Sequence, residues 1–106
     1  MRTWWILTSL LVSALTPETA HAQDTSADKA IAQTWCANCH SINPGEKPTA
    51  GDTAPNFVSI AQMQSTTEMS LAAFLTTPHG RMPNLSLSRT EIRDISAYIL
   101  SLRTQQ

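Results

Sequence analysis

Cys36, Cys39 and His40 lie together in a six-residue segment, WCANCH, and the chain contains only these two cysteines. A thiolate is a nucleophile and a soft metal ligand, and a neutral imidazole is a common metal ligand. The segment could therefore form a disulfide, act as a redox-active thiol pair, contribute to a zinc site or attach a heme covalently.

Three of these possibilities lack support in the rest of the sequence. A disulfide between cysteines so close together would close a very small loop and stabilise nothing distant. A thioredoxin-type pair follows a strand among alternating strands and helices, and no alternating strand pattern is visible here. A structural zinc site needs a complete tetrahedral set of ligands, and beyond WCANCH residues 23–106 offer only His79.

The fourth possibility is covalent heme. In the pattern C-x-x-C-H the thiols add across the heme vinyl groups, and the adjacent histidine becomes an axial iron ligand. The sequence therefore predicts one covalently attached heme c per chain, bonded through Cys36 and Cys39, with its iron bound by His40.

The second axial position decides what such a heme can do. A strong sixth ligand favours electron transfer, whereas an open position admits small ligands or peroxide. The candidates for this position are Met63, Met69, Met82 and His79. Most methionines are apolar core residues, and that role is expected for Met63 and Met69. Met82 and His79 lie in an irregular link bounded by prolines, so both are candidates for the iron.

The elements that must position these residues are predicted to be helical. Residues 28–35 lack glycine and proline, and they predict a helix that runs into WCANCH. A polar residue should cap its start, and the candidates are Asp24, Thr25 and Ser26. Residues 41–54 are rich in Pro, Gly, Asn and Asp and predict a loop. Residues 58–63 predict one or two helical turns.

Two later helices are better marked. Ser65 and Glu68 fit a capping box, in which the two residues satisfy each other's backbone N–H groups, and Ser88 and Glu91 fit a second one. The first of these helices should end at Pro78. In the second, apolar residues recur at helical spacing and predict a buried stripe: Ile92, Ile95, Ile99 and Leu102. The predicted fold is all-α, with three or four helices around one covalently bound heme.

Residues 1–22 are expected to be a secretory signal peptide. One arginine precedes an apolar run of about a dozen residues, and Ala20-His21-Ala22 supplies a small-residue cleavage signature. The run is shorter than the roughly 20 apolar residues that span a membrane, so no stable membrane insertion is expected after cleavage. Residues 23–106 would then be a soluble periplasmic domain. With a net charge of −1 and no basic run, nucleic acid is not expected as a partner.

Residues 23–106 resemble the small class I cytochromes c of the bacterial periplasmic type over nearly their whole length. The matching segments are WCANCH, APNF at 54–57, RMPNL at 81–85 and EIRDISAYILSL at 91–102. The family usually has a glycine eight residues before the first cysteine, where this chain has Asp28. The resemblance implies Met82 as the second axial ligand, with His79 as the alternative. It also implies that the carbonyl of Pro55 accepts the free N–H of His40.

This resemblance implies a function as well. The expected protein is a monomeric mono-heme carrier, not an enzyme, that passes single electrons between redox proteins by transient docking. The heme should lie among apolar side chains, namely Trp35, Phe57, Phe74, Leu85, Tyr98 and Ile99. The alternative, if Met82 does not bind iron, is an open-site heme protein for gas sensing or peroxidase-like chemistry. The chain lacks the lysine ring of mitochondrial cytochromes c, so strong electrostatic docking is not expected.

Overall fold

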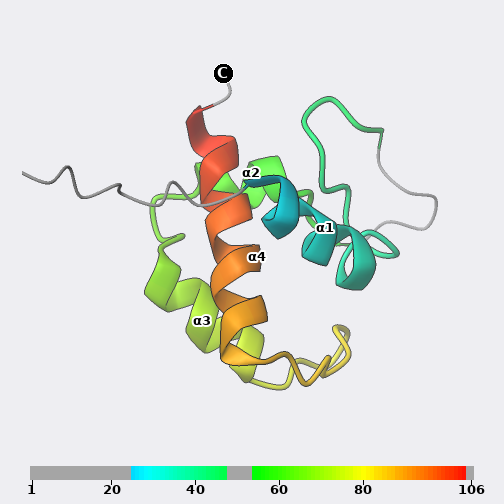
Figure 1. Ribbon diagram of the computed structural model, residues 1–106, viewed down its shortest axis with the longest axis vertical. Coiled ribbons are helices and arrows are strands. Elements are labelled where there is room, and N and C mark those ends of the chain that lie inside the picture. Colours follow the sequence, from blue (N-terminus) through cyan, green and yellow to red (C-terminus); the bar gives the residue numbers. More distant parts are fainter. Residues whose placement is uncertain (1–24, 48–53, 105–106) are drawn as a thin grey trace, which may run out of the picture.

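Helix α4 (Arg89–Ser101) is the element against which the other helices pack. In this computed structural model, which describes residues 25–47 and 54–104, the elements follow the order α1 (Thr25–Trp35), α2 (Phe57–Gln62), α3 (Glu68–Thr76), α4 and a short 3-10 helix, η1 (Leu102–Thr104). Figure 1 shows α3 and α1 on opposite sides of α4, and α2 also contacts it. The described residues contain no strand, which confirms the predicted all-α fold.

The predicted apolar stripe, which lies on α4 and continues to the first residue of η1, is buried. Ile92, Ile95, Ile99 and Leu102 all belong to the buried apolar residues, and burying a side chain of this size contributes about 1.5–3 kcal/mol. The predicted capping box is present at the start of the helix. The Ser88 hydroxyl accepts the backbone N–H of Glu91, and the Glu91 carboxylate accepts the N–H of Ser88 at 2.8 Å.

The predicted capping box of α3 is wrong, because the helix begins two residues later than the Ser65 cap requires. Its N-cap is Thr67, whose hydroxyl accepts the N–H of Ser70, while the Ser70 hydroxyl accepts the N–H of Thr67. Thr66 is buried and donates its hydroxyl to the carbonyl of Ile60 at 2.7 Å. This inward turn places Thr67, rather than Ser65, at the start of the helix. The helix ends at Thr76, before Pro78, as predicted.

Helix α1 begins at Thr25, earlier than the predicted residue 28. Thr25 and Ser26 are therefore helical residues rather than caps, and the third candidate, Asp24, lies outside the described residues. Asp28 is buried, and α1 packs against α4 without the glycine that the family usually has there. Helix α2 matches the predicted helical turns to within one residue and is capped by the Asn56 side chain.

Tyr98 connects α4 to the segment that follows WCANCH. Its buried hydroxyl donates to the carbonyl of Ile42 at 2.8 Å, and both residues belong to the core. The predicted signal peptide, residues 1–22, lies outside the described residues. Among the helices that the structure does describe, none combines the length and the apolar character needed to cross a membrane.

Candidate functional site

WCANCH turns away from the C-terminal end of α1. The N–H groups of Cys39 and His40 both donate to the carbonyl of Cys36, at 3.1 and 2.9 Å. This turn holds His40 close to Cys36 in space. Cys36 is buried, Cys39 is exposed, and both are free thiols rather than partners in a disulfide.

The imidazole of His40 is oriented by a carbonyl from a distant part of the sequence. Its Nδ1 lies 2.6 Å from the carbonyl oxygen of Pro55. A carbonyl only accepts hydrogen bonds, so Nδ1 carries a proton. In the neutral imidazole Nε2 is then the nitrogen whose lone pair can bind a metal. The N–H of Phe57 donates to the carbonyl of Ser41 at 3.0 Å, which holds this segment beside the histidine. The contact is the one that the family resemblance implies, and the role of His40 as an iron ligand stays a prediction.

A largely apolar cavity of about 360 Å³ opens beside His40. Its size falls within the range of roughly 300–1,000 Å³ that is typical of small-molecule and cofactor sites. Cys36, His40 and Met82 all line it, so a thiol, an imidazole and a thioether face one space. The other lining residues are Pro55, Phe57, Ile60, Met63, Ser65, Thr66, Ser70, Leu71, Phe74, Leu75, Ile95 and Ile99. An apolar cavity with these donors fits an iron-containing hydrophobic ring.

Only some of the apolar side chains predicted to surround the heme line this cavity. Phe57, Phe74 and Ile99 line the cavity, whereas Trp35, Leu85 and Tyr98 do not. Trp35 is 41% exposed at the end of α1. The hydroxyl of Tyr98 donates to the carbonyl of Ile42. Leu85 lines a separate, smaller pocket.

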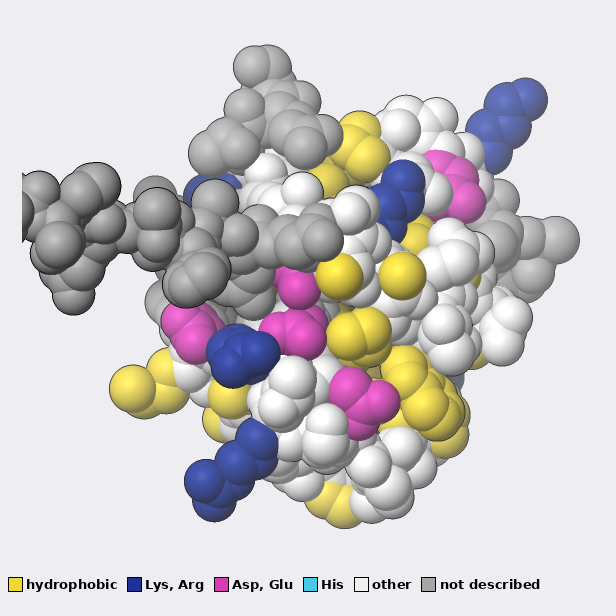
Figure 2. Space-filling view, viewed as in Figure 1, with side chains coloured by type: hydrophobic (Ala, Val, Ile, Leu, Met, Phe, Trp, Pro, Cys, Tyr) yellow, Lys and Arg dark blue, Asp and Glu magenta, His cyan; other side chains and the backbone are white. Residues whose placement is uncertain are grey.

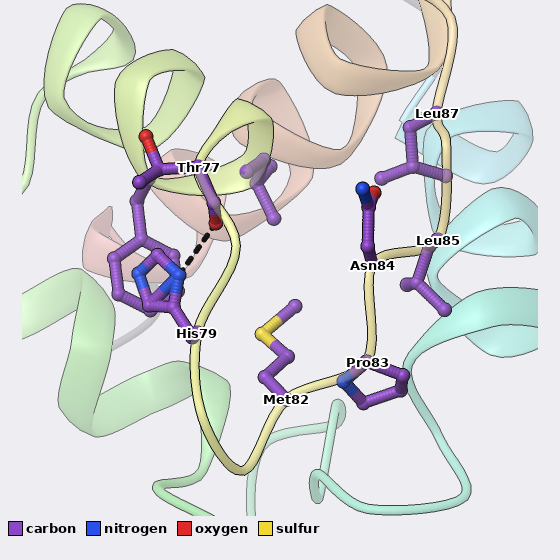
Figure 3. A pocket seen from close by; sticks show the side chains of 9 residues that line it. Thr77, His79, Met82, Pro83, Asn84, Leu85 and Leu87 are labelled. Carbon is purple, nitrogen blue, oxygen red and sulfur yellow. Dashed lines mark hydrogen bonds between the residues drawn. The ribbon is translucent and has the colours of Figure 1, made fainter.

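The two candidates for the second axial position differ in whether they reach the large cavity as well as this smaller pocket. Met82 and His79 both line it (Figure 3), but only Met82 also lines the large cavity. His79 packs its ring against Phe74, with centroids 3.7 Å apart, and its Nδ1 donates to the carbonyl of Thr77. Figure 3 shows the Met82 side chain pointing into the space between His79 and Leu85. Met82 is therefore the candidate in this link that has access to the large cavity.

Met63 and Met69 are not core residues, and that prediction is wrong. Met69 is 83% exposed in the first turn of α3, and Met63 is 50% exposed. Met63 follows the last residue of α2 in an extended conformation, and it lines the large cavity. It is a second thioether at the cavity, a position that the sequence does not predict because nothing in the local pattern distinguishes Met63 from a core methionine.

The ionisation of Cys36 bears on the competing thiol chemistry. Burial and the neighbouring Cys39 raise the pKa of the Cys36 thiol to about 11. At neutral pH this group is therefore a thiol rather than a thiolate, and the thiolate is the form that acts in disulfide exchange. The raised pKa of Cys36 therefore disfavours a redox-active thiol pair.

Comparisons with known proteins agree with the chemistry of the cavity. The family model described as Cytochrome c matches residues 27–103, a range that includes Cys36, His40 and Met82. A curated relative, Cytochrome c-552 from Bradyrhizobium diazoefficiens, is 42% identical over 91 residues, which cover 86% of this chain and 81% of the relative. No solved structure gives a significant match.

Proposed function

Because this chain belongs to the cytochrome c family, as a mono-heme c-type electron carrier, we propose that it carries single electrons between redox proteins of the periplasm. Cys36 and Cys39 would bond the heme, His40 and Met82 would bind its iron, and Pro55 would orient His40. When bound, heme c supplies an iron that gains or loses one electron. Export to the periplasm, with cleavage after Ala22, would provide the compartment in which the chain meets its partners.

The observation that carries this proposal is the shared cavity. Cys36 and His40 reach it from the end of α1, and Met82 reaches it from the link between α3 and α4. A soft thioether ligand favours ferrous over ferric iron, and apolar surroundings disfavour additional net charge on the site. Both effects support a fairly high reduction potential, which suits an electron carrier better than an oxygen-activating enzyme.

Met82 also weighs against an enzyme or a gas sensor. Such a protein needs an iron position that exogenous ligands can enter. A methionine that already lines the cavity can occupy that position. We therefore propose a carrier without catalytic activity of its own.

The partners are proposed to dock transiently, without strong electrostatic steering. On the face shown in Figure 2, the described Lys and Arg side chains are interspersed with Asp and Glu side chains. The net charge of the whole chain is −1. A mixed surface of this kind provides little long-range attraction of one sign, and a monomer that binds each partner briefly is consistent with it.

Binding of carbon monoxide to the reduced protein tests this function. The protein is produced together with a heme-attachment system, and its visible spectrum is recorded oxidised, reduced, and reduced under carbon monoxide. The expected result is a six-coordinate spectrum that carbon monoxide does not change. Rapid and complete carbon monoxide binding would instead identify an open-site heme protein.

A further inference from the structure

The Arg103 side chain joins the C-terminal end of the chain to the end of α2. Its Nε donates to the carbonyl of Ala61 at 2.7 Å. Its Nη2 donates to the carbonyls of Met63 and Thr66, at 3.1 and 2.7 Å. One guanidinium in η1 therefore binds three carbonyls of a single short segment.

The three acceptors lie in the last turn of α2 and directly after it. Ala61 is in the last turn of this six-residue helix, where carbonyls have no partner within the helix. Met63 is the C-cap residue, whose carbonyl also accepts the N–H of Thr66, and Thr66 begins the turn into α3. Arginine side chains near a helix C-terminus can satisfy such carbonyls and interact favourably with the helix dipole. The planar guanidinium presents its N–H groups in a fixed fork, so one side chain can bind several acceptors in a defined geometry.

The same segment forms one wall of the large cavity. Ile60, Met63, Ser65 and Thr66 all line that cavity, and residues 60–66 are called the 60–66 wall below. Two further hydrogen bonds shape this wall: Thr66 donates its hydroxyl to the carbonyl of Ile60, and Ser70 donates its hydroxyl to the carbonyl of Ser65. Arg103 thus holds the backbone of a segment whose side chains face the cavity.

We propose that Arg103 is a positioning residue of the electron carrier, whose guanidinium holds the 60–66 wall against the heme and thereby keeps the reduction potential high. The proposal rests on the function proposed above. Solvent access and polarity around a metal site control its reduction potential. A wall that opens admits water, water stabilises the more highly charged ferric state, and the potential falls.

Two substitutions separate this role from a simple effect of charge. Arg103→Lys keeps the positive charge and loses the planar fork, whereas Arg103→Gln loses both. Arg93→Lys is the matched control, because Arg93 is an exposed residue of α4 that pairs with the adjacent Asp94. The reduction potential and the backbone amide exchange of the 60–66 wall are measured on each heme-loaded variant.

In both Arg103 variants the backbone amides of the 60–66 wall should exchange about tenfold faster than in the wild type. The wall can then open locally without breaking the hydrogen bonds to the guanidinium, so opening costs less free energy. Both variants should also show a lowered reduction potential, and Arg93→Lys should change neither quantity. If Arg103→Lys keeps the wild-type potential while Arg103→Gln lowers it, the charge acts alone and the positioning role is wrong. Wild-type exchange in both variants would also overturn it.

A variant within the wall covers the case in which the Arg103 variants do not fold. Thr66→Val removes the hydroxyl bond to Ile60, so it should loosen the wall and lower the potential in the same direction. A loosened wall with an unchanged potential would contradict the proposal. The exchange measurement does not depend on which residue binds the iron. Its failure is therefore distinguishable from carbon monoxide binding by the wild type, which would overturn the proposed function.

Discussion

Replacing Tyr98 by phenylalanine removes one hydroxyl from the core and leaves the ring in place. In the wild type this hydroxyl donates to the carbonyl of Ile42 at 2.8 Å, and Ile42 is 1% exposed. The variant therefore leaves a buried carbonyl without this donor and with little access to water. The hydrogen bond joins α4 to the segment directly after His40, so its loss should destabilise the domain around the site.

The expected cost is about 2 kcal/mol, from the hydrogen bond and the desolvated carbonyl together. For a domain of this size that is a decrease in Tm of roughly 10 °C. Thermal and guanidinium unfolding of the heme-loaded protein, followed by circular dichroism, would measure it. Thr76→Val is a suitable control, because it removes an exposed hydroxyl that bonds within α3, and it should change stability by less than about 0.5 kcal/mol. An equally small effect of Tyr98→Phe would refute the reasoning.

The pH dependence of this difference provides a second check. Burial, with a further contribution from the Glu46 carboxylate, raises the pKa of Tyr98 above its ordinary value of 10.0. Because the folded pKa is higher than the unfolded one, the stabilisation is complete below pH 10 and is lost as the pH rises through the folded pKa. Tyr98→Phe lacks this titration. The stability difference between wild type and variant should therefore narrow above pH 10. A difference that widens there would contradict the raised pKa of Tyr98 in the folded protein.

Three further predictions concern the α4 cap and the heme attachment. Ser88→Ala should cost about 1 kcal/mol in thermal unfolding, because it removes the N-cap hydroxyl. The pKa of Glu91 is lowered from its ordinary value of 4.5. The largest cause is a hydrogen bond from the backbone of Ser88, followed by one from the Ser88 side chain and a smaller one from the Trp35 side chain. The stabilisation by Glu91 is present above pH 4.5 and is lost as the pH falls through the lowered pKa, so Glu91→Gln should flatten the acid limb of the stability profile. Substituting both Cys36 and Cys39 by alanine should leave no heme on the denatured peptide by mass spectrometry, and the variant without heme should unfold with little cooperativity. Colour that stays with the doubly substituted peptide after acid-acetone extraction would disprove attachment through these thiols.

The features that could be predicted from the sequence are those encoded by local spacing. The stripe from Ile92 to Leu102 and the box of Ser88 and Glu91 depend on residues three or four apart, and the structure contains both. The cysteines and the histidine that predict heme attachment are likewise close together in the sequence, in the segment WCANCH.

The features that could not be predicted depend on tertiary packing. Two possible capping boxes overlap at the start of α3, and the burial of Thr66 decides between them. Met63 is partly exposed at the cavity because α2 ends before it. No repeating pattern of apolar residues in the sequence indicates that the helix ends there. The carbonyl acceptors of Arg103 lie 37 to 42 residues away in the sequence, and a backbone carbonyl carries no residue-specific signal at all.

Met82 and Met63 are both thioethers at the cavity, so comparing their alanine variants tests the central claim most directly. The measurement is the weak charge-transfer band of sulfur-ligated ferric heme, recorded together with carbon monoxide binding to the reduced protein. Met82→Ala should lose the band, bind carbon monoxide and show a lowered reduction potential, because it loses a ligand that favours ferrous iron. Met63→Ala should keep the band and exclude carbon monoxide. A Met82→Ala protein that keeps the band and excludes carbon monoxide would show that another residue holds the iron.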